Sequence, residues 1–586
     1  MAGNLNTPHM LALCALLAAI LPTAALGEAP SPREVAQHHW QNVAEVVAFG
    51  DVHGAYQQLH DALQTAGLID AQGTWTGGTT HLVSLGDLLD RGDDSRKVMD
   101  LLMRLQAQAI AAGGRVHVVL GNHEVMNLTG DLRYVAAGEY AAFADQDSES
   151  AAQDPAVPSG FANHRRGFAS DGYYGRWLLQ LPLLVQINDS IFVHGGLPPL
   201  LAEESIPVVN ERFREELGNL LRLSEPLQQA GLVNPAEDLL GQTRSLVEWL
   251  QHPDNAEADR QLVDDITQFV RITQSDLFSW QSPNWYRGTA KCAQPVEDAV
   301  LSAALAKQGA ARVIVGHTPT STRRVQQRFG DRAVLADTGM LASYYRGQAS
   351  LVFIRGGSLA VQYPATASDY GDPDPIHALG RSPATIEALL ADAPLPAQAP
   401  SEPFVIDSLR VVYERGNKRT NGNKVAAYRL SQLLGWNVVP VTVNRGDGVL
   451  IALPNKSITE AKRIEANVSR PNHCAIGNVY QLMYAFDALI QNEQRTADSI
   501  VYDQSDWQLF LMGHGSAFGR SSRSLPKYLQ AQPRVLPGAV LERLQTLSQT
   551  QLNEALSEWL SESQIKAIMK RRDNLIRDWG PLPLTP

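Results

Sequence analysis

Five short apolar runs in this chain each end in a motif that contains Asp, His or Asn. In chain order the motifs are GDVHG (Gly50 to Gly54), GDLLDRG (Gly86 to Gly92), GNHE (Gly121 to Glu124), VHGG (Val193 to Gly196) and GHTP (Gly316 to Pro319). Apolar runs of this length predict buried strands, and the carboxyl ends of parallel strands meet at one edge of a sheet. The chain is therefore expected to gather these polar side chains into one site on an α/β fold.

The first three motifs belong to one alternation of strands and helices over residues 43–121. Helical stretches at 55–66 and 94–112 separate the apolar runs, which is the pattern of a βαβαβ unit with a parallel sheet. Residues 200–275 differ, because their apolar residues recur at helical spacing and no ligand-like motif appears among them. We interpret this stretch as a helical insertion near the site.

The side chains of the motifs suit a pair of divalent metal ions. Carboxylate and amide oxygens mixed with imidazoles are ligands that Mn²⁺, Fe and Zn²⁺ all accept, and paired ions of this kind hydrolyse phosphate esters. Asp51 and His53 alternate with Val52, so both can leave the same face of a strand end. A single GD or GN pair could equally be turn chemistry. Five such motifs in order, with four of the fifteen histidines among them, favour a metal site.

This ordered set of five motifs resembles the one found in the calcineurin-like metallophosphoesterases. Within them it is most similar to the PPP-type phosphoprotein phosphatases, and there to the Shewanella-like bacterial branch. HEVMNLTGDLRY (residues 123–134), FVHGGL (192–197) and SPNWYRG (282–288) extend the likeness, which covers roughly residues 43–363. It implies a metallophosphoesterase fold, a βαβαβ β-sandwich flanked by helices, over a catalytic domain at residues 28–365.

The resemblance also implies two divalent metal ions, with Mn²⁺ expected first and Fe or Zn²⁺ as alternatives. The two implied ligand sets share one carboxylate: Asp51, His53 and Asp87 for one ion, and Asp87, Asn122, His194 and His317 for the other. A carboxylate suits the shared position because it has two oxygens. A hydroxide bridging the two ions would then attack phosphorus in line.

Four neighbours of the ligands complete the implied machinery. Arg91 and Arg287 resemble the family's phosphate clamps, a role that suits the planar fork of a guanidinium. The alternative for both arginines is a solvent-facing ion pair. His123 would donate a proton to the leaving alkoxide, and Asp90 would orient it and keep it charged.

A second, α+β domain is expected at residues 404–586, after a Pro-rich linker at 366–403. NKVAAYRLSQLLGWNVVPVTV (423–443) and WQLFLMGHGSAF (507–518) resemble the atypical kinase fold of lipid and secretory pathways. The positions that depart from such kinases are Lys424, Gln494, Ser499 and Gly513. Since Gln and Gly can neither accept a substrate proton nor hold Mg²⁺ through a carboxylate, the likeness implies a degenerate, pseudokinase-like module that binds or regulates. The alternative is an unrelated α+β domain.

The N-terminus predicts a signal peptide at residues 1–27. Met10 to Ala25 is almost wholly apolar yet short for a membrane span, and Ala25-Leu26-Gly27 offers small residues for cleavage before Glu28. The region before it lacks Lys and Arg, which departs from the usual pattern, and a buried first helix is the alternative. We expect a periplasmic or secreted protein without a stable membrane span after cleavage. The mature chain would keep Cys292 and Cys474, and the sequence leaves open whether they pair.

These features together predict a metal-dependent phosphomonoester hydrolase acting on phosphoprotein or phosphopeptide, at Ser/Thr or Tyr. One alternative is a phosphatase of small molecules or nucleotides that scavenges phosphate in the periplasm. Another is a phospho-ligand sensor that works through the C-terminal module, whose partner the sequence does not identify. The formal charge of −12 argues against a nucleic-acid partner, because phosphate backbones are held mainly by basic surface.

Overall fold

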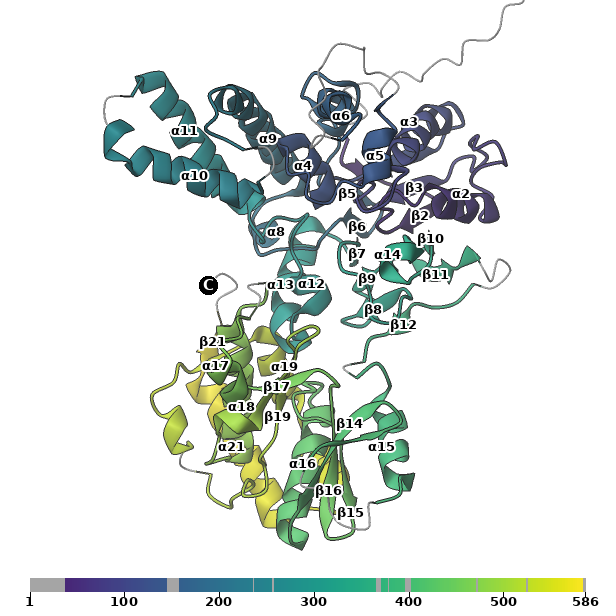
Figure 1. Ribbon diagram of the computed structural model, residues 1–586. Coiled ribbons are helices and arrows are strands. Elements are labelled where there is room, and N and C mark those ends of the chain that lie inside the picture. The colour runs from purple at the N-terminus through teal and green to yellow at the C-terminus, as the bar shows by residue number, and fades with distance from the viewer. Residues whose placement is uncertain are drawn as a thin grey trace, which may run out of the picture.

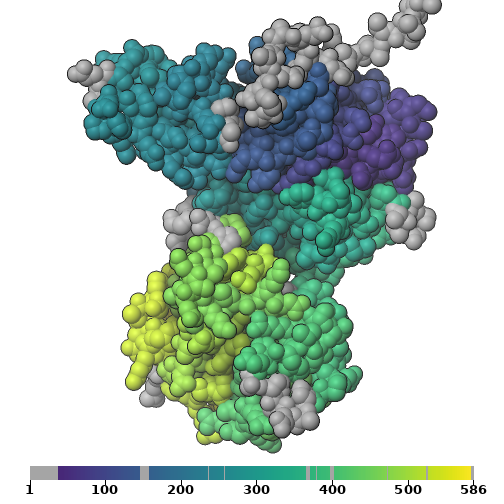
Figure 2. Space-filling model, in the orientation of Figure 1, coloured from purple at the N-terminus to yellow at the C-terminus, as the bar shows by residue number. Residues whose placement is uncertain are grey.

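The computed structural model describes nine stretches of the chain: residues 37–144, 158–234, 237–255, 258–364, 370–377, 379–395, 402–470, 473–522 and 525–582. The predicted signal peptide, residues 1–27, lies outside the described residues. Two lobes meet at a narrower waist (Figures 1 and 2), and we refer to them as the N-terminal and C-terminal domains. No helix in the described stretches has the length and apolar character needed to cross a membrane.

The first sheet of the N-terminal domain contains the strands that carry the first three motifs. Its order is β11 (Ser358–Gln362), β10 (Leu351–Arg355), β2 (Glu45–Phe49), β3 (His81–Ser84) and β4 (Arg115–Val118). β2, β3 and β4 pair in parallel, and the crossovers contain α2 (Tyr56–Thr65) and α3 (Ser95–Ala111). The expected βαβαβ unit is therefore present, and its three strand ends lie at one edge.

The second sheet carries the last two motifs and packs against the first. Its order is β1 (His39–Trp40), β5 (Leu184–Ile187), β6 (Ser190–Val193), β7 (Arg312–Val315), β9 (Ala333–Leu335), β8 (Gln326–Arg328) and β12 (Asp374–Pro375). One apolar cluster joins side chains of both sheets, including Val46 and Val83 from the first and Phe192 and Ile314 from the second. The N-terminal domain is thus a β-sandwich, as the sequence predicts, with its core between the sheets.

Helices surround the sandwich and extend to one side of it (Figure 1). Outside the stretch 200–275, the further helices of this domain are α4 (Asn122–Thr129), α5 (Ala137–Ala141), α6 (Phe161–Phe168), α7 (Tyr173–Leu178), α12 (Gly288–Lys291), α13 (Gln294–Gln308) and α14 (Ala342–Tyr345). The stretch 200–275 forms α8 (Leu200–Glu203), α9 (Ile206–Gln229), α10 (Leu239–Gln251) and α11 (Arg260–Thr273), with the 3₁₀ turn η2 (Pro253–Asn255). Another turn, η3 (Asp276–Phe278), follows. A separate apolar cluster around Leu220, Leu246 and Phe269 holds α9, α10 and α11 together, whereas Leu201 of α8 belongs to the main core of the domain.

The C-terminal domain combines small sheets with helices, in agreement with the α+β expectation. Its strands form β13 (Phe404–Ile406), β14 (Leu409–Arg415), β16 (Gly448–Leu453) and β15 (Thr442–Arg445), then β17 (Ser457–Thr459), β18 (Ile500–Asp503) and β19 (Leu509–Leu511), and the pair β20 (Val535–Leu536) and β21 (Gly580–Pro581). Its helices are α16 (Lys418–Leu433), α17 (Glu460–Glu465), α18 (Ile476–Ile490), α19 (Gly538–Thr546), α20 (Gln549–Leu556) and α21 (Glu562–Asp578), with the turns η5 (Ala497–Ser499) and η6 (Lys527–Leu529).

The described part of the Pro-rich stretch 366–403 is not an uncored linker. β12 pairs with β8 in the N-terminal sheet, and α15 (Pro383–Asp392) follows it. Ile386 and Leu390 on α15 are buried in the core of the C-terminal domain. Ser382 caps the helix by accepting a hydrogen bond from the Thr385 N–H, and Pro383 occupies a first-turn position where its fixed φ fits. Pro383 therefore starts a helix and does not mark a spacer.

The two domains are joined by packing and by a covalent bond. Val296 of α13 contributes to the hydrophobic core of the C-terminal domain. Cys292, just before α13, forms a disulfide with Cys474, just before α18, and their Cα atoms are 5.5 Å apart. This pairing answers the question that the sequence left open. A cavity of about 710 Å³ also lies between the domains and is lined by residues of both.

Candidate metal centre

Two loops that follow adjacent strands hold the first three predicted ligands. The N–H groups of Val52 and His53 both donate to the Asp87 carbonyl, at 3.0 and 2.9 Å, so the loops after β2 and β3 are locked together. His53 and Asp87 have positive φ values of 49° and 52°. A left-handed backbone is costly for residues other than glycine and is found where a site imposes it. The same conformation occurs at three further predicted site residues, Asp90, Arg91 and His317.

Asp87 lies at the centre of the buried cluster. Its Oδ1 is 3.2 Å from Nε2 of His194, and its Oδ2 is 3.7 Å from Nε2 of His53 and 3.8 Å from Nε2 of His123. Asp87 belongs to two groups whose potential ligand atoms lie within 4.8 Å of one another: His53, Asp87 and His123 in one, and Asp87, His194 and His317 in the other. A carboxylate shared by two such groups is the arrangement expected of a bridging ligand.

The remaining predicted ligands adjoin this cluster. Asn122 Oδ1 is 3.0 Å from Nε2 of His194. Asp51 Oδ2 is 3.8 Å from Nε2 of His53, and its Oδ1 accepts the His317 N–H at 2.9 Å. All six predicted ligands are therefore gathered at one place. The first group differs from the predicted set, because His123 approaches Asp87 where Asp51 was expected.

The imidazoles are oriented for coordination through Nε2. Nδ1 of His53 is 2.8 Å from the Leu89 carbonyl, and Nδ1 of His194 is 2.7 Å from the Leu85 carbonyl. A backbone carbonyl can only accept, so each Nδ1 carries the proton and leaves Nε2 with a lone pair. Burial holds the pKa values of His53 and His317 well below the ordinary value, which keeps both rings neutral. Nε2 of His317 is buried and has no hydrogen-bond partner in the described part of the chain.

The carboxylates show that the cluster lacks positive charge. Burial, followed by the charges of Asp337 and Asp87, raises the pKa of Asp51 well above its usual value. Burial also raises the pKa of Asp337, whose buried Oδ2 has no hydrogen-bond partner among the described residues. Burial opposes ionisation of Asp87 too, but the imidazoles of His194 and His123 hold its pKa well below the usual value. The donor set and the orphaned polar atoms fit a pair of divalent cations, which would offset this negative charge.

His123 has the environment of a protonated imidazole. Its Nδ1 is 2.5 Å from Asp90 Oδ2, and Asp90 Oδ1 accepts a hydrogen bond from Asn127 at 3.0 Å. Burial opposes protonation of His123, but the carboxylates of Asp87 and Asp90 raise the pKa of its ring above the ordinary value. The ring is thereby oriented and kept able to donate a proton, with Nε2 facing Asp87.

Arg91 and Arg287 approach the cluster from two sides. The Arg91 guanidinium contacts Nε2 of His53 and the hydroxyl of Tyr345. Arg287 Nη1 donates to the His317 carbonyl at 3.1 Å and to Thr318 Oγ1 at 2.9 Å, and burial lowers the pKa of Arg287. Within the described stretches neither arginine is in an ion pair with a carboxylate, so the surface ion-pair alternative does not describe them.

Sequence reasoning missed several residues that shape the site. The Glu124 carboxylate accepts hydrogen bonds from the N–H groups of Gly121, Asp87 and Leu88 at 2.7–2.9 Å, so it joins the start of α4 to the loop after β3. The spacing of Gly121 and Glu124 at the start of a helix was the available signal. Asp337 follows the short strand β9, a weaker repeat of the pattern of the five motifs. Tyr345 on α14 had no signal in the sequence.

Two of the positions that depart from the kinase pattern, Ser499 and Gly513, are adjacent in the C-terminal domain. A Cβ placed on Gly513 would lie 3.1 Å from the Cβ of Ser499. Arg495 donates to Ser499 Oγ at 3.2 Å and forms an ion pair of 2.6 Å with the fully buried Asp487. Lys424 instead pairs with Glu414 at 2.6 Å. The place is thus filled by internal ion pairs, and the kinase-like origin of the domain stays a prediction.

The N-terminal domain is similar to several known proteins. Residues 44–336 match the model of the calcineurin-like phosphoesterases. The chain is 32% identical to Shewanella-like protein phosphatase 2 of Arabidopsis thaliana over 31% of this chain and 54% of the plant protein, about half its length. The structure of a cold-active protein-tyrosine phosphatase of a psychrophilic Shewanella is 25% identical over 56% of this chain and 82% of that one, with a TM-score of 0.40. The predicted likeness to the calcineurin-like phosphoesterases and to the Shewanella-like phosphatases is confirmed.

The structure of hydra Fam20 with a sugar is 14% identical and covers 30% of this chain and 80% of that one, with a TM-score of 0.22.

Proposed function

The chain belongs to the calcineurin-like phosphoesterase family, and we propose that it hydrolyses phosphomonoesters of proteins or peptides at a two-metal site. The observation that carries the proposal is the sharing of Asp87 between two groups of buried ligands, with the His123–Asp90 pair beside it. Shared ligation supports two metals, and the paired imidazole and carboxylate support protonation of a leaving group. The similarity to a named protein phosphatase supports a protein substrate.

Each part of the site has a proposed task. Two divalent ions, Mn²⁺ by preference, would supply the Lewis acidity that lowers the pKa of water and neutralises phosphate oxygens. The ligands proposed to hold them are Asp51, His53, Asp87, Asn122, His194 and His317. Arg287 and Arg91 present guanidinium N–H groups to the non-bridging oxygens and hold the phosphate in line. His123 donates its Nε2 proton to the leaving oxygen, while Asp90 keeps the ring oriented.

The rim of the site supports a peptide substrate with an aromatic phosphoester. Three tyrosine rings surround the Arg91 guanidinium, with centroids 5.3 Å (Tyr134), 5.5 Å (Tyr344) and 5.4 Å (Tyr345) from its central carbon. Tyr134 is 39% exposed and Tyr344 is 58% exposed. Partly exposed aromatic side chains beside a phosphate-binding group favour contact with a phosphotyrosine ring over contact with the smaller phosphoserine. We therefore place phosphotyrosine peptides first among the candidate substrates.

The decisive experiment compares substrates and a ligand variant in the metal-loaded mature protein. Phosphotyrosine and phosphoserine peptides, p-nitrophenyl phosphate and nucleotides are assayed for kcat/KM. Asp87→Asn keeps the shape of the side chain but removes the shared charge, so it should abolish most turnover and one equivalent of bound metal. Near-normal turnover in this variant would refute the two-metal assignment. A preference for nucleotides over every peptide would instead favour a scavenging phosphatase.

We also propose that the protein is exported, with Glu28 as its first mature residue. The disulfide between Cys292 and Cys474 supports this proposal, because structural disulfides persist mainly in oxidising compartments. N-terminal sequencing of protein recovered from a periplasmic or culture fraction tests it. Recovery of the uncleaved chain from the reducing interior of the cell would contradict it.

A further inference from the structure

One short helical turn connects the proposed phosphate clamp to the disulfide. Arg287 is the residue before α12, Gly288–Lys291, and Cys292 is the residue after it. Arg287 reaches into the metal centre, where it donates to the His317 carbonyl and to Thr318. Cys292 reaches in another direction, to Cys474 of the C-terminal domain. A displacement at one end of so short a helix is therefore transmitted to the other end.

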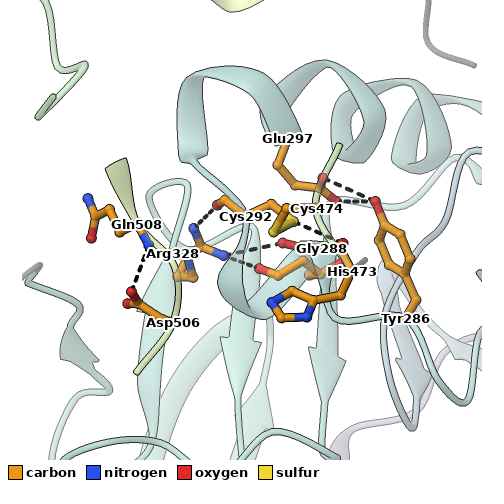
Figure 3. Close-up of a disulfide and its surroundings, with 10 residues drawn as sticks. Tyr286, Gly288, Cys292, Glu297, Arg328, His473, Cys474, Asp506 and Gln508 are labelled. Carbon is orange, nitrogen blue, oxygen red and sulfur yellow. Dashed lines mark hydrogen bonds between the residues drawn. A yellow bond between two sulfur atoms is a disulfide. The ribbon is translucent and has the colours of Figure 1, made fainter. Parts of the chain in front are cut away.

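The N-terminal domain holds this segment by two sets of hydrogen bonds (Figure 3). The Tyr286 hydroxyl donates to the Glu297 carboxylate at 2.8 Å. The buried Arg328 donates to the carbonyls of Thr289 and Cys292, both at 2.5 Å. These bonds fix the side chain before Arg287, the carbonyl of Thr289 within α12 and the carbonyl of Cys292 just after it. The Arg287 backbone itself lies between the two anchored points.

The C-terminal domain supplies the other contacts. Besides the disulfide, Lys291 Nζ donates to the Ser505 carbonyl at 3.3 Å. Arg287 and Lys291 are close enough to His473 that, after burial, their charges lower its pKa to about 4. The clamp thus lies within electrostatic reach of the C-terminal domain. Cys474 is the covalent member of this set of contacts.

We propose that the C-terminal domain positions Arg287 for phosphate binding through the Cys292–Cys474 disulfide, and that reduction of this bond weakens the clamp. The inference rests on the proposed function, since it needs Arg287 to contact the substrate phosphate. Cys292 and Cys474 are positioning residues, because they act through α12 and do not touch the phosphate. The C-terminal domain then has a task in the reaction of the N-terminal domain.

The switching step is an exchange with a dithiol reductant. One thiolate of the dithiol attacks the sulfur of Cys474, the Cys292–Cys474 bond breaks, and Cys292 leaves as a thiolate that takes up a proton. The second thiol of the reductant then loses its proton and displaces Cys474, so that the protein gains two thiols and the reductant becomes a disulfide. A cavity of about 50 Å³ lined by both cysteines adjoins the bond, and Cys474 is only partly buried.

The test measures phosphatase kinetics of the full mature chain in oxidised and reduced form. A dithiol reductant should raise KM and the inhibition constant of inorganic phosphate by roughly tenfold, with a smaller effect on kcat. The double variant Cys292→Ser/Cys474→Ser should match the reduced protein and should not respond to the reductant. Because Cys14 lies in the predicted signal peptide, the mature chain has no further cysteine to confuse the result.

A second variant separates positioning from general stabilisation. If the disulfide acts through Arg287, then reduction should change KM little in an Arg287→Ala background, where the clamp is already absent. An equal change in KM in both backgrounds would overturn the proposal, and so would loss of the far-ultraviolet circular dichroism on reduction. Intact activity in Arg287→Ala would refute the clamp and this inference together. A redox-insensitive KM in an enzyme that Arg287→Ala impairs would refute this inference alone.

Discussion

His123 is buried between two carboxylates, and although burial opposes protonation, the charges of Asp87 and Asp90 raise the pKa of its ring above the ordinary value. Such a proton is most valuable when the leaving group is a poor one. An alkoxide needs it, whereas a phenolate with a low pKa leaves without it. The residue therefore contributes unequally to different substrates.

We expect His123→Ala to reduce kcat for a phosphoserine peptide by about 10²- to 10⁴-fold, the usual contribution of a general acid. The loss for p-nitrophenyl phosphate should be much smaller. Steady-state kinetics with both substrates measure the ratio. Asn127→Ala, which removes a hydrogen bond to Asp90 but no charge, is the matched control and should affect both substrates modestly. Equal losses in His123→Ala would argue that the ring supports the fold only.

A second residue-scale prediction concerns stability at low pH. His81 and His117 lie on adjacent strands with their ring nitrogens 3.0 Å apart, away from the metal centre. Burial lowers the pKa of His81 to about 4 and holds that of His117 well below its ordinary value. In the unfolded chain both would protonate near pH 6.5. The unfolded state thus binds more protons, and the stability present above pH 6.5 declines as the pH falls toward 4.

Urea unfolding between pH 7 and pH 5 measures this decline. His81→Asn should reduce the slope of unfolding free energy against pH, because one buried ring no longer resists protonation. His252→Asn is the control, since it removes a histidine whose side chain is 60% exposed. Identical slopes in wild type and His81→Asn would contradict the assignment.

At the scale of elements, Glu124 joins α4 to the loop after β3. Its carboxylate is the acceptor for three backbone N–H groups, and burial followed by the charge of Asp87 raises its pKa to about 7. It therefore fixes Asp87 and Asn122 relative to one another without being a ligand itself.

Glu124→Ala should leave those N–H groups unsatisfied, at a cost of about 1–3 kcal/mol for each group that water cannot reach. We expect a lower thermal midpoint and a 10- to 100-fold weaker affinity for the metal, since ligand orientation is lost. Calorimetric titration with Mn²⁺ measures the second effect. Glu124→Gln keeps an acceptor oxygen and should lose less of both. Unchanged metal affinity in the Ala variant would show that the loop holds its shape alone.

The sequence predicted elements well where chemistry and periodicity agreed. Strand ends followed by Asp, Asn or His predicted β2, β3, β4, β6 and β7, and the family resemblance implied which six of these side chains are ligands. Asp337 was missed because a three-residue strand gives little periodic signal, and Tyr345 because its approach depends on how α14 packs. The stretch 366–403 was predicted as a linker because it is rich in proline, but prolines occur both in linkers and at helix starts. The burial of Ile386 and Leu390 in the C-terminal core shows that α15 is part of the domain, and this packing cannot be seen in the sequence.

At the scale of the whole molecule, each domain has its own hydrophobic core, and Val296 extends from α13 of one into the core of the other. The disulfide adds a constraint across 182 residues. Cross-links of this span restrict the unfolded chain and contribute about 2–4 kcal/mol. The domains should consequently unfold together when the bond is intact.

Differential scanning calorimetry should show one unfolding transition for the oxidised protein and two for Cys292→Ser/Cys474→Ser. The lower of the two should be sensitive to Val296→Asp, which places a charge in the C-terminal core. Added Mn²⁺ should raise the midpoint of only one of the two transitions, and that transition belongs to the N-terminal domain. A single transition in the serine variant would mean that packing alone couples the domains.

The Cys292–Cys474 bond also changes what a protease can accomplish. Any single backbone cut between residues 293 and 473 opens a loop and does not divide the particle, because the two fragments stay linked through sulfur. A nicked molecule would run as an intact chain on a gel without reductant and as two bands with it. A backbone cut in this stretch would then leave the molecule in one piece until the disulfide is reduced, and the two fragments would then be free to separate.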